Sequence, residues 1–159
     1  MKLMRRATGR PPPSGMTHGE LFAERLTHSV IGAFYEVYRT LGHGFLEHLY
    51  VLALERELRA RGHRVQREVA VPVFYKGELL GMQRVDMVVD DMLIVETKSS
   101  HELQRGARRQ RFSYLSGTRL EVGLLLHFGP EPKFYRMERR RGAAGGGDAV
   151  YELSEERED

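Results

Sequence analysis

Hydrophobic residues follow two different spacings along this chain, and the change of spacing separates helical from extended segments. From residue 17 to residue 61 they recur every three or four positions, as on one face of a helix, and Gly42 and Gly62 mark the ends of two helices. Apolar runs then alternate with turn pairs such as Lys76-Gly77 and Asp90-Asp91. The pattern predicts helices at 17–40, 45–61 and 102–116, and strands at 65–75, 79–89, 93–98, 122–128 and 134–137.

This order of elements defines the fold class. The strand at 93–98, the helix at 102–116 and the almost uninterrupted apolar strand at 122–128 form a right-handed crossover unit with parallel strands. The preceding hairpins are antiparallel, so we expect an α/β domain with a mixed sheet flanked by helices. The chain divides into a proline-rich leader at 1–16, the domain at 17–137, and a glycine-rich linker with an acidic tail, expected to be disordered, at 138–159. Met16 is a second candidate start, and Thr17 is the candidate N-cap of the first helix.

Ionisable residues interrupt the second and third β runs, where burial makes a charge costly unless it is paired or bound to a cation. Glu96 and Lys98 alternate with Thr97 and therefore point to one face of their strand. Asp86 joins them only if the intervening turn has three residues, since a two-residue turn at Asp90-Asp91 puts the two carboxylates on opposite faces. We expect the three-residue register, or a bulge with the same effect.

Two carboxylates brought together in this way repel each other unless a divalent cation lies between them. Carboxylate oxygens are hard ligands of the kind that Mg²⁺ prefers. The ammonium of Lys98 then lies beside whatever the metal polarises, which suits metal-assisted hydrolysis. The alternative is an ordinary α/β domain in which Lys98 forms a structural ion pair with Glu96 or Asp86.

An aspartate followed ten positions later by Glu-x-Lys resembles the signature of the PD-(D/E)xK nuclease superfamily. The segment GFLEHLY, from Gly44 to Tyr50, fits the GxxExxY pattern that names one bacterial family within it. Between about Glu24 and Arg136 the chain follows the motif order of that family: LALERELRARG, VPVFYKG, RVD, VETK, QRFSYL and VGLLLHFG. Three positions depart from the pattern: Val85 replaces a proline, Thr97 an apolar residue and His127 an asparagine.

The resemblance implies a restriction-endonuclease-like αβββαβ core and a nuclease that uses Mg²⁺ or Mn²⁺ to hydrolyse nucleic acid, for which we expect DNA. It implies that the metal is held by Asp86, Glu96, the backbone carbonyl of Thr97 and Glu47, with Lys98 beside the attacked phosphate. Similarity to RecB-type nucleases implies that Gln110 is a further catalytic residue and that Tyr114 orients the phosphate.

Local chemistry leaves other readings of these residues open. Glu47 lies near the start of the second helix, where a carboxylate can simply cap exposed amides and gain from the helix dipole. Gln110 and Tyr114 are four residues apart and share one stripe of the third helix, where they can also be an amide at the helix margin and a core tyrosine. Tyr50 is expected in the core, and we take all seven histidines as structural or surface residues.

Positive charge clusters after the Glu-x-Lys strand. Residues 101–141 carry ten Lys and Arg against four Asp and Glu, whereas residues 21–100 carry ten against eleven. Such a cluster near the candidate site suits a phosphate-binding surface, with a solvated helix face as the alternative for the arginine run. The arginines that we assign to substrate binding are Arg84, Arg108, Arg109 and Arg111.

The composition excludes some classes of protein and site but does not identify the function. A chain of 159 residues that is 41% hydrophobic supports one compact domain. It contains no cysteine, which excludes disulfides, thiolate zinc sites and a cysteine nucleophile and fits the cytoplasm. No run has the length of a membrane span. We therefore expect a cytoplasmic nuclease, which can be a homodimer, and keep as the alternative a catalytically silent module on the same fold that binds nucleic acid or protein.

Overall fold

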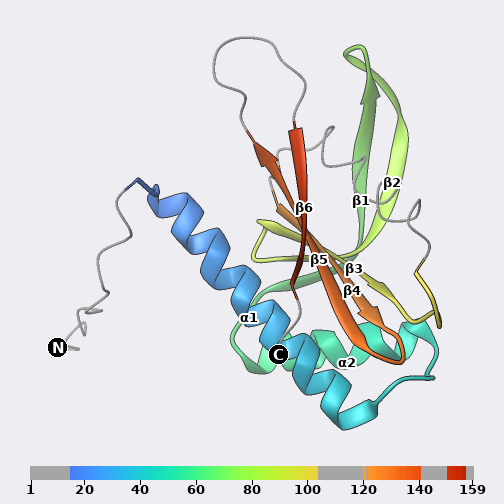
Figure 1. The fold of residues 1–159 in the computed structure, drawn as a ribbon. Coiled ribbons are helices and arrows are strands. Elements are labelled where there is room, and N and C mark those ends of the chain that lie inside the picture. Colours follow the sequence, from blue (N-terminus) through green and yellow to red (C-terminus); the bar gives the residue numbers. More distant parts are fainter. Residues whose placement is uncertain (1–14, 104–119, 121, 141–149, 157–159) are drawn as a thin grey trace, which may run out of the picture.

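The computed structural model of this chain describes residues 15–103, 120, 122–140 and 150–156. Within these residues two helices precede a run of strands (Figure 1). The helices are α1 (His18–Leu41) and α2 (Glu47–Ala60), and the strands are β1 (Val65–Tyr75), β2 (Glu78–Val89), β3 (Leu93–Lys98), β4 (Val122–Phe128), β5 (Pro132–Arg140) and β6 (Val150–Glu156). The third helix was predicted at 102–116, and residues 104–116 of it lie outside the described part of the chain.

One mixed sheet contains all the described strands, in the order β1-β2-β3-β4-β5-β6. Neighbouring strands are antiparallel except β3 and β4, which pair in parallel from Leu93↔Val122 to Lys98↔His127. Because a parallel pair requires the chain to cross over between its two strands, the predicted crossover between residues 98 and 122 is confirmed.

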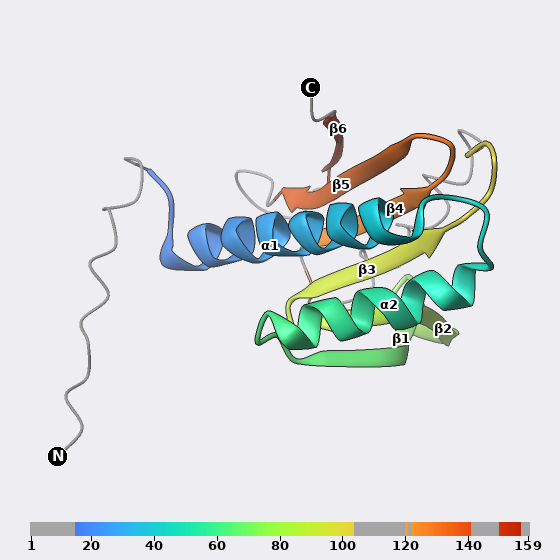
Figure 2. The same cartoon turned by 90° about the horizontal axis from the view of Figure 1, so that it is seen from below.

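The two helices lie side by side on one face of the sheet (Figure 2). Phe128 on β4 contacts both of them, since its ring meets Phe34 edge to face at 4.8 Å and stacks on Tyr50 at 4.2 Å between centroids. Burial of each such side chain contributes roughly 1.5–3 kcal/mol and holds the helices on the sheet. We name this core the helix-side cluster; among its buried residues are Leu26, Val30, Phe34, Tyr50, Leu54, Leu58, Val65, Met87, Val89, Leu93, Val95, Leu124, Leu126 and Phe128.

Helix α1 begins at a capping box. The Thr17 hydroxyl accepts a hydrogen bond from the Glu20 N–H at 3.2 Å, and the Glu20 carboxylate accepts one from the Thr17 N–H at 2.7 Å. The bond from the Thr17 N–H, and a second one of 2.9 Å that the Thr17 hydroxyl donates to the same carboxylate, hold the pKa of Glu20 below its usual value. Gly42, with a φ of 68°, ends the helix and donates its N–H to the Tyr38 carbonyl. The predicted N-cap and stop are thus confirmed.

The other face of the sheet is also covered. Leu103 and Leu120, at the two ends of the segment that joins β3 to β4, pack against it. Every residue of β4 is buried, which explains the uninterrupted apolar sequence of this strand. We name the buried residues on this side the opposite-face cluster: Val71, Val85, Val88, Ile94, Leu125, Tyr135 and Met137.

The predicted and the observed elements differ at α2, β5 and β6. Helix α2 begins at Glu47, because the preceding Leu46 is extended, with φ −62° and ψ 141°, and forms the N-cap. The strand predicted at 134–137 extends over Pro132–Arg140. Within the predicted tail, Val150–Glu156 form β6, which pairs with β5 along its length. Ladder hydrogen bonds come from the backbone, so an acidic segment of low hydrophobicity can still form a strand.

Candidate active site

The β2–β3 hairpin fixes the register of the candidate site. The turn between the strands spans three residues, Asp90 to Met92, so the predicted three-residue register is confirmed. Continued by one step, this register puts Asp86 opposite Glu96. The paired residues are Met87↔Val95, Val88↔Ile94 and Val89↔Leu93.

The β1–β2 hairpin changes direction at Asp86. Met87 packs in the helix-side cluster, whereas Val85 packs in the opposite-face cluster. On a regular strand residues two apart share a face, so the alternation is broken between them. Glu68, which has a φ of 51°, lies across from Asp86 on β1. The β1–β2 hairpin extends away from β3 (Figure 1). The pairing of β2 with β3 ends at Met87↔Val95, directly beside Asp86.

Asp86 is bound to the Glu-x-Lys segment of β3. Its Oδ2 accepts hydrogen bonds from the Thr97 N–H at 2.7 Å and from the Thr97 hydroxyl at 3.1 Å. The carboxylate therefore takes the place of a strand carbonyl just beyond the last ladder pair. This contact holds Asp86 next to Glu96, whose residue is only 4% exposed. A charged carboxylate at that depth requires compensation by hydrogen bonds, a counter-charge or a metal.

Lys98 forms an ion pair with helix α2. As the last residue of β3 it donates from Nζ to both oxygens of Glu47, at 3.0 and 3.2 Å. The two side chains are 20% and 38% exposed. The structural pair considered from the sequence, between Lys98 and a carboxylate of the hairpin, is therefore replaced by one with the helix. Among the hydrogen bonds of the described residues, both Glu47 oxygens accept from Lys98 and neither accepts from a backbone N–H of α2.

Tyr50 and Gly44 explain how Glu47 reaches Lys98. The buried Tyr50 donates its hydroxyl to the Gly42 carbonyl at 2.6 Å and accepts the Phe45 N–H at 3.3 Å, which ties down the loop between the helices. Gly44 has a φ of 103°, which a residue with a side chain rarely adopts. The loop therefore delivers the first residue of α2 to the end of β3. The prediction that Tyr50 is a core residue is confirmed.

His127 shapes the chain just after Lys98. It lies on β4 opposite Lys98 and is 4% exposed, and its Nε2 is 2.6 Å from the Ser100 carbonyl oxygen. Because a carbonyl only accepts, Nε2 carries the hydrogen of this bond. This histidine thus holds the segment that follows the Glu-x-Lys motif.

The oxygen atoms around Asp86 are of the type that binds a hard divalent cation. They are carboxylate and carbonyl oxygens, the ligands that Mg²⁺ and Mn²⁺ prefer. Among the residues that the structure describes, however, no three side chains of His, Cys, Asp or Glu come together to hold a metal. Glu47 is turned toward Lys98, so the side chains that fit best are Asp86 and Glu96, and Glu47 as a direct ligand stays a prediction.

The predicted substrate-binding residues are placed only in part. Arg84 lies on β2, two residues before Asp86, with its side chain 76% exposed and 3.8 Å from Glu68. It is free to reach a polyanion near the carboxylates, because an exposed pair at this distance is weak. The other predicted residues lie outside the described part of the chain: Arg108, Arg109, Gln110, Arg111 and Tyr114.

A groove between α1 and α2 lies apart from these carboxylates. It has a volume of about 510 Å³ and is lined by residues such as Val37, Leu41 and Leu49. None of the described candidate residues lines it. The site is therefore defined by the end of β3 and not by this groove.

Comparison with known proteins identifies the superfamily of this chain. A family model described as the PD-(D/E)XK nuclease superfamily matches residues 24–141 of the 159. The chain therefore belongs to the PD-(D/E)XK nuclease superfamily. It is also similar to the crystal structure of SSO0001, with 18% identity, a TM-score of 0.41, and coverage of 74% of this chain and 59% of that chain.

The comparison with curated proteins and the helices of the described residues add two negative findings. No curated protein matches the sequence. Within the described residues, no helix is both long and apolar enough to cross a membrane.

Sequence interpretation missed one polar network near the site. Ser29, His63 and Asp90 are joined by two hydrogen bonds of 2.7 Å, although they lie far apart in the sequence. The one signal for it was the Asp90-Asp91 turn pair, which was interpreted only as a turn. A serine inside a helix and a single histidine after a glycine carry no recognisable spacing.

Proposed function

We propose that this protein is a metal-dependent nuclease of the GxxExxY family that hydrolyses phosphodiester bonds, with DNA as its substrate. The observation that carries the proposal is the meeting of Asp86 and the Glu96-Thr97-Lys98 segment at the point where β2 leaves β3. Oxygen donors and an ammonium at one place are what phosphodiester hydrolysis requires. Membership of the nuclease superfamily supports a nucleic-acid substrate.

The residues divide the chemistry between them. Asp86 and Glu96 would hold Mg²⁺ or Mn²⁺, together with the backbone carbonyl of Thr97. When bound, such an ion supplies Lewis-acid polarisation of the phosphoryl oxygen and lowers the pKa of a water. Lys98 would donate to the phosphate or position the attacking water. Glu47, at 3.0 Å from its Nζ, holds this ammonium in place.

A cleavage panel tests the proposal. Single-stranded DNA, duplex DNA and RNA are incubated with Mg²⁺, Mn²⁺ or Ca²⁺ and either the native protein or Asp86→Asn. We expect metal-dependent cleavage that the substitution reduces about 100-fold or more, because one charged ligand is lost. Asp91→Asn is the matched control, since Asp91 lies in the same hairpin with a side chain 55% exposed and should retain full activity. An Asp86→Asn protein as active as the native one would rule out this site.

Metal binding can be measured without turnover. A ligand at ten times its dissociation constant stabilises the folded state by about 1.4 kcal/mol. Millimolar Mg²⁺ should therefore raise the thermal midpoint of the native protein and of Asp91→Asn, but not that of Asp86→Asn. An equal response of all three proteins would place the ion elsewhere.

A catalytically silent binding module is the second candidate. It is favoured by the Glu47–Lys98 ion pair, which already neutralises the ammonium that hydrolysis would use. Under this function the protein would bind nucleic acid in the panel and leave it intact with every metal. Retention of bound, uncut substrate by both the native protein and Asp86→Asn would establish it.

A further inference from the structure

The apolar pattern of β2 and β3 does not determine how they pair. The three residues of β2 that pair with β3 are all buried, and so are their three partners. A slip by one residue would exchange one buried apolar side chain for another on each face of the sheet. The hydrophobic pattern specifies register through the contrast between a buried apolar face and a polar one. The paired residues of β2 and β3 are apolar on both faces, so another feature must select the register.

The turn between these strands has an unusual backbone. Asp90 and Asp91 have φ values of 50° and 56°, in the left-handed region that side chains disfavour. The Met92 N–H closes the turn on the Val89 carbonyl at 3.1 Å. Two consecutive residues of positive φ are also what a two-residue type I′ turn uses. The local conformation alone therefore leaves both registers available.

Asp90 is fixed to the neighbouring loop by three hydrogen bonds. Its N–H donates to the Arg64 carbonyl at 2.8 Å, and its Oδ1 accepts the Arg64 N–H at 2.8 Å. Its Oδ2 lies 2.7 Å from Nδ1 of His63. These contacts place Asp90 next to the start of β1, and so fix the direction in which the chain leaves β2. Asp91, by contrast, contacts only the side chain of Arg64 among the described ion pairs.

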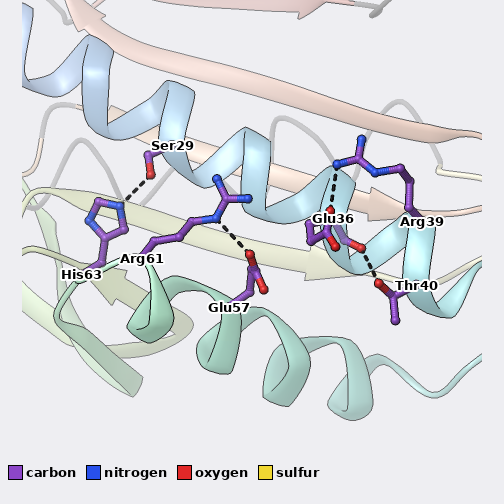
Figure 3. Close-up of polar contacts among 7 residues, drawn as sticks. All are labelled: Ser29, Glu36, Arg39, Thr40, Glu57, Arg61 and His63. Carbon is purple, nitrogen blue, oxygen red and sulfur yellow. Dashed lines mark hydrogen bonds and ion pairs between the residues drawn. The ribbon is translucent and has the colours of Figure 1, made fainter.

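His63 is in turn held by helix α1. Its Nε2 lies 2.7 Å from the Ser29 hydroxyl (Figure 3). Because this hydroxyl can donate or accept, the network is satisfied with the imidazole neutral or charged. Serine, histidine and aspartate are hydrogen-bonded here in the same order as in a hydrolase triad. Ser29, however, lies inside α1, where the backbone N–H groups donate to the carbonyls of the helix itself. The described residues therefore give Ser29 no backbone oxyanion hole, and the network is better suited to positioning.

We propose that Asp90, anchored by His63 and the Arg64 backbone, selects the three-residue register of the β2–β3 hairpin and thereby positions Asp86 for the reaction. In this register Asp86 lies opposite Glu96 and reaches the Thr97 N–H. In the two-residue register it would lie opposite Val95, on the other face from Glu96. Asp90 is thus a positioning residue four residues from Asp86, about 13 Å along the strand. Its catalytic consequence rests on the proposed nuclease function.

Two glycine substitutions separate the side chain of Asp90 from the turn preference. Asp90→Gly creates Gly-Asp and Asp91→Gly creates Asp-Gly, and both pairs favour a two-residue hairpin turn. Only Asp91→Gly retains the carboxylate that binds His63 and Arg64. Backbone NOEs across the strands report the register, since Val88 faces Ile94 in the native pairing and Leu93 after a slip of one residue. We expect the native contact in Asp91→Gly and its loss in Asp90→Gly.

Asp90→Asn is the conservative variant. Its amide oxygen can still accept the Arg64 N–H, and asparagine tolerates positive φ, so we expect the native register. If the protein cleaves, Asp90→Gly should lower kcat about 100-fold, while Asp90→Asn and Asp91→Gly stay within a few-fold of native activity. Circular dichroism and cooperative urea unfolding check that each variant folds. If Asp90→Gly does not fold, the backbone NOEs of Asp90→Asn and Asp91→Gly are compared with those of the native protein.

The outcomes are separable. A Val88–Ile94 contact in folded Asp90→Gly, or its loss in either of the other variants, would overturn the role of Asp90 in register selection. A slipped Asp90→Gly that still cleaves at the native rate would overturn the positioning of Asp86. Absence of cleavage by the native protein with every metal, with the NOE pattern as expected, would overturn the nuclease function and leave the register assignment intact.

Discussion

Removing either partner of the Glu47–Lys98 ion pair gives a measure of what the pair contributes. At the 3.0 Å separation of Nζ and Oε1, two unit charges attract by about 5.5 kcal/mol if the effective dielectric constant is about 20. Desolvation and side-chain ordering offset most of this energy, and exposed pairs retain about 0.2–1 kcal/mol. Because these side chains are 20% and 38% exposed, we expect a net coupling near the upper end, about 1 kcal/mol.

A double-mutant cycle in urea isolates this coupling. The four proteins are the native chain, Glu47→Gln, Lys98→Met and the double variant, and the cycle cancels what each change does by itself. The coupling corresponds to a shift of about 2–4 °C in thermal midpoint for a domain of this size. A coupling below about 0.3 kcal/mol would refute the reasoning, because the two groups would then be solvated independently.

Exchange of the two charges separates structure from chemistry. In a Glu47→Lys, Lys98→Glu protein the attraction is restored, so its stability should exceed that of either charge-reversed single variant. Its cleavage activity should stay at the level of Lys98→Met, because the ammonium no longer lies at the end of β3. Recovery of activity in the exchanged protein would show that the pair is only structural.

Two further outcomes follow from hydrogen bonds outside the charge pair. Tyr50→Phe should cost about 2 kcal/mol in urea unfolding, since the Gly42 carbonyl and the Phe45 N–H lose their partner, while cleavage stays within about threefold; a large loss of activity at unchanged stability would instead make the hydroxyl catalytic. The capping box should add a pH dependence. The folded pKa of Glu20 is lowered, so its contribution is present above the unfolded value of 4.5 and is lost as pH falls through the folded pKa. The gap in urea midpoint between the native protein and Glu20→Gln should therefore shrink between pH 6 and pH 3, whereas a constant gap would contradict this linkage.

Elements governed by periodicity were predictable from the sequence. Strands β3 and β4 have the predicted bounds, and α1 has its predicted cap and stop, because each depends on a local apolar pattern or a local hydrogen bond. Helix α2 was predicted two residues too early, since Phe45 and Leu46 continue the apolar pattern while the backbone is still extended. Strand β6 was missed because its pairing depends on a partner strand and not on its own composition.

The sequence named candidate residues for the site but did not indicate their contacts. The Asp and Glu-x-Lys spacing identified Asp86, Glu96 and Lys98, and the favoured turn length was correct. Nothing local indicates that Lys98 pairs with a glutamate 51 positions earlier, because that contact depends on how α2 packs on the sheet. The same holds for His63 and Asp90, 27 positions apart, which meet only once β1 and the hairpin are paired.

Polar contacts, and not the apolar core, give this site its geometry. The core supplies most of the stability, but the apolar residues of β2 and β3 would accept either register. Two contacts make the choice: Asp90 with the start of β1, and Asp86 with Thr97. Each lies at the end of an element, where backbone groups need partners that the element itself does not provide. A substitution at one of these contacts should therefore displace reacting groups at modest cost in stability, whereas a substitution in the helix-side cluster should lower stability and leave the site in place.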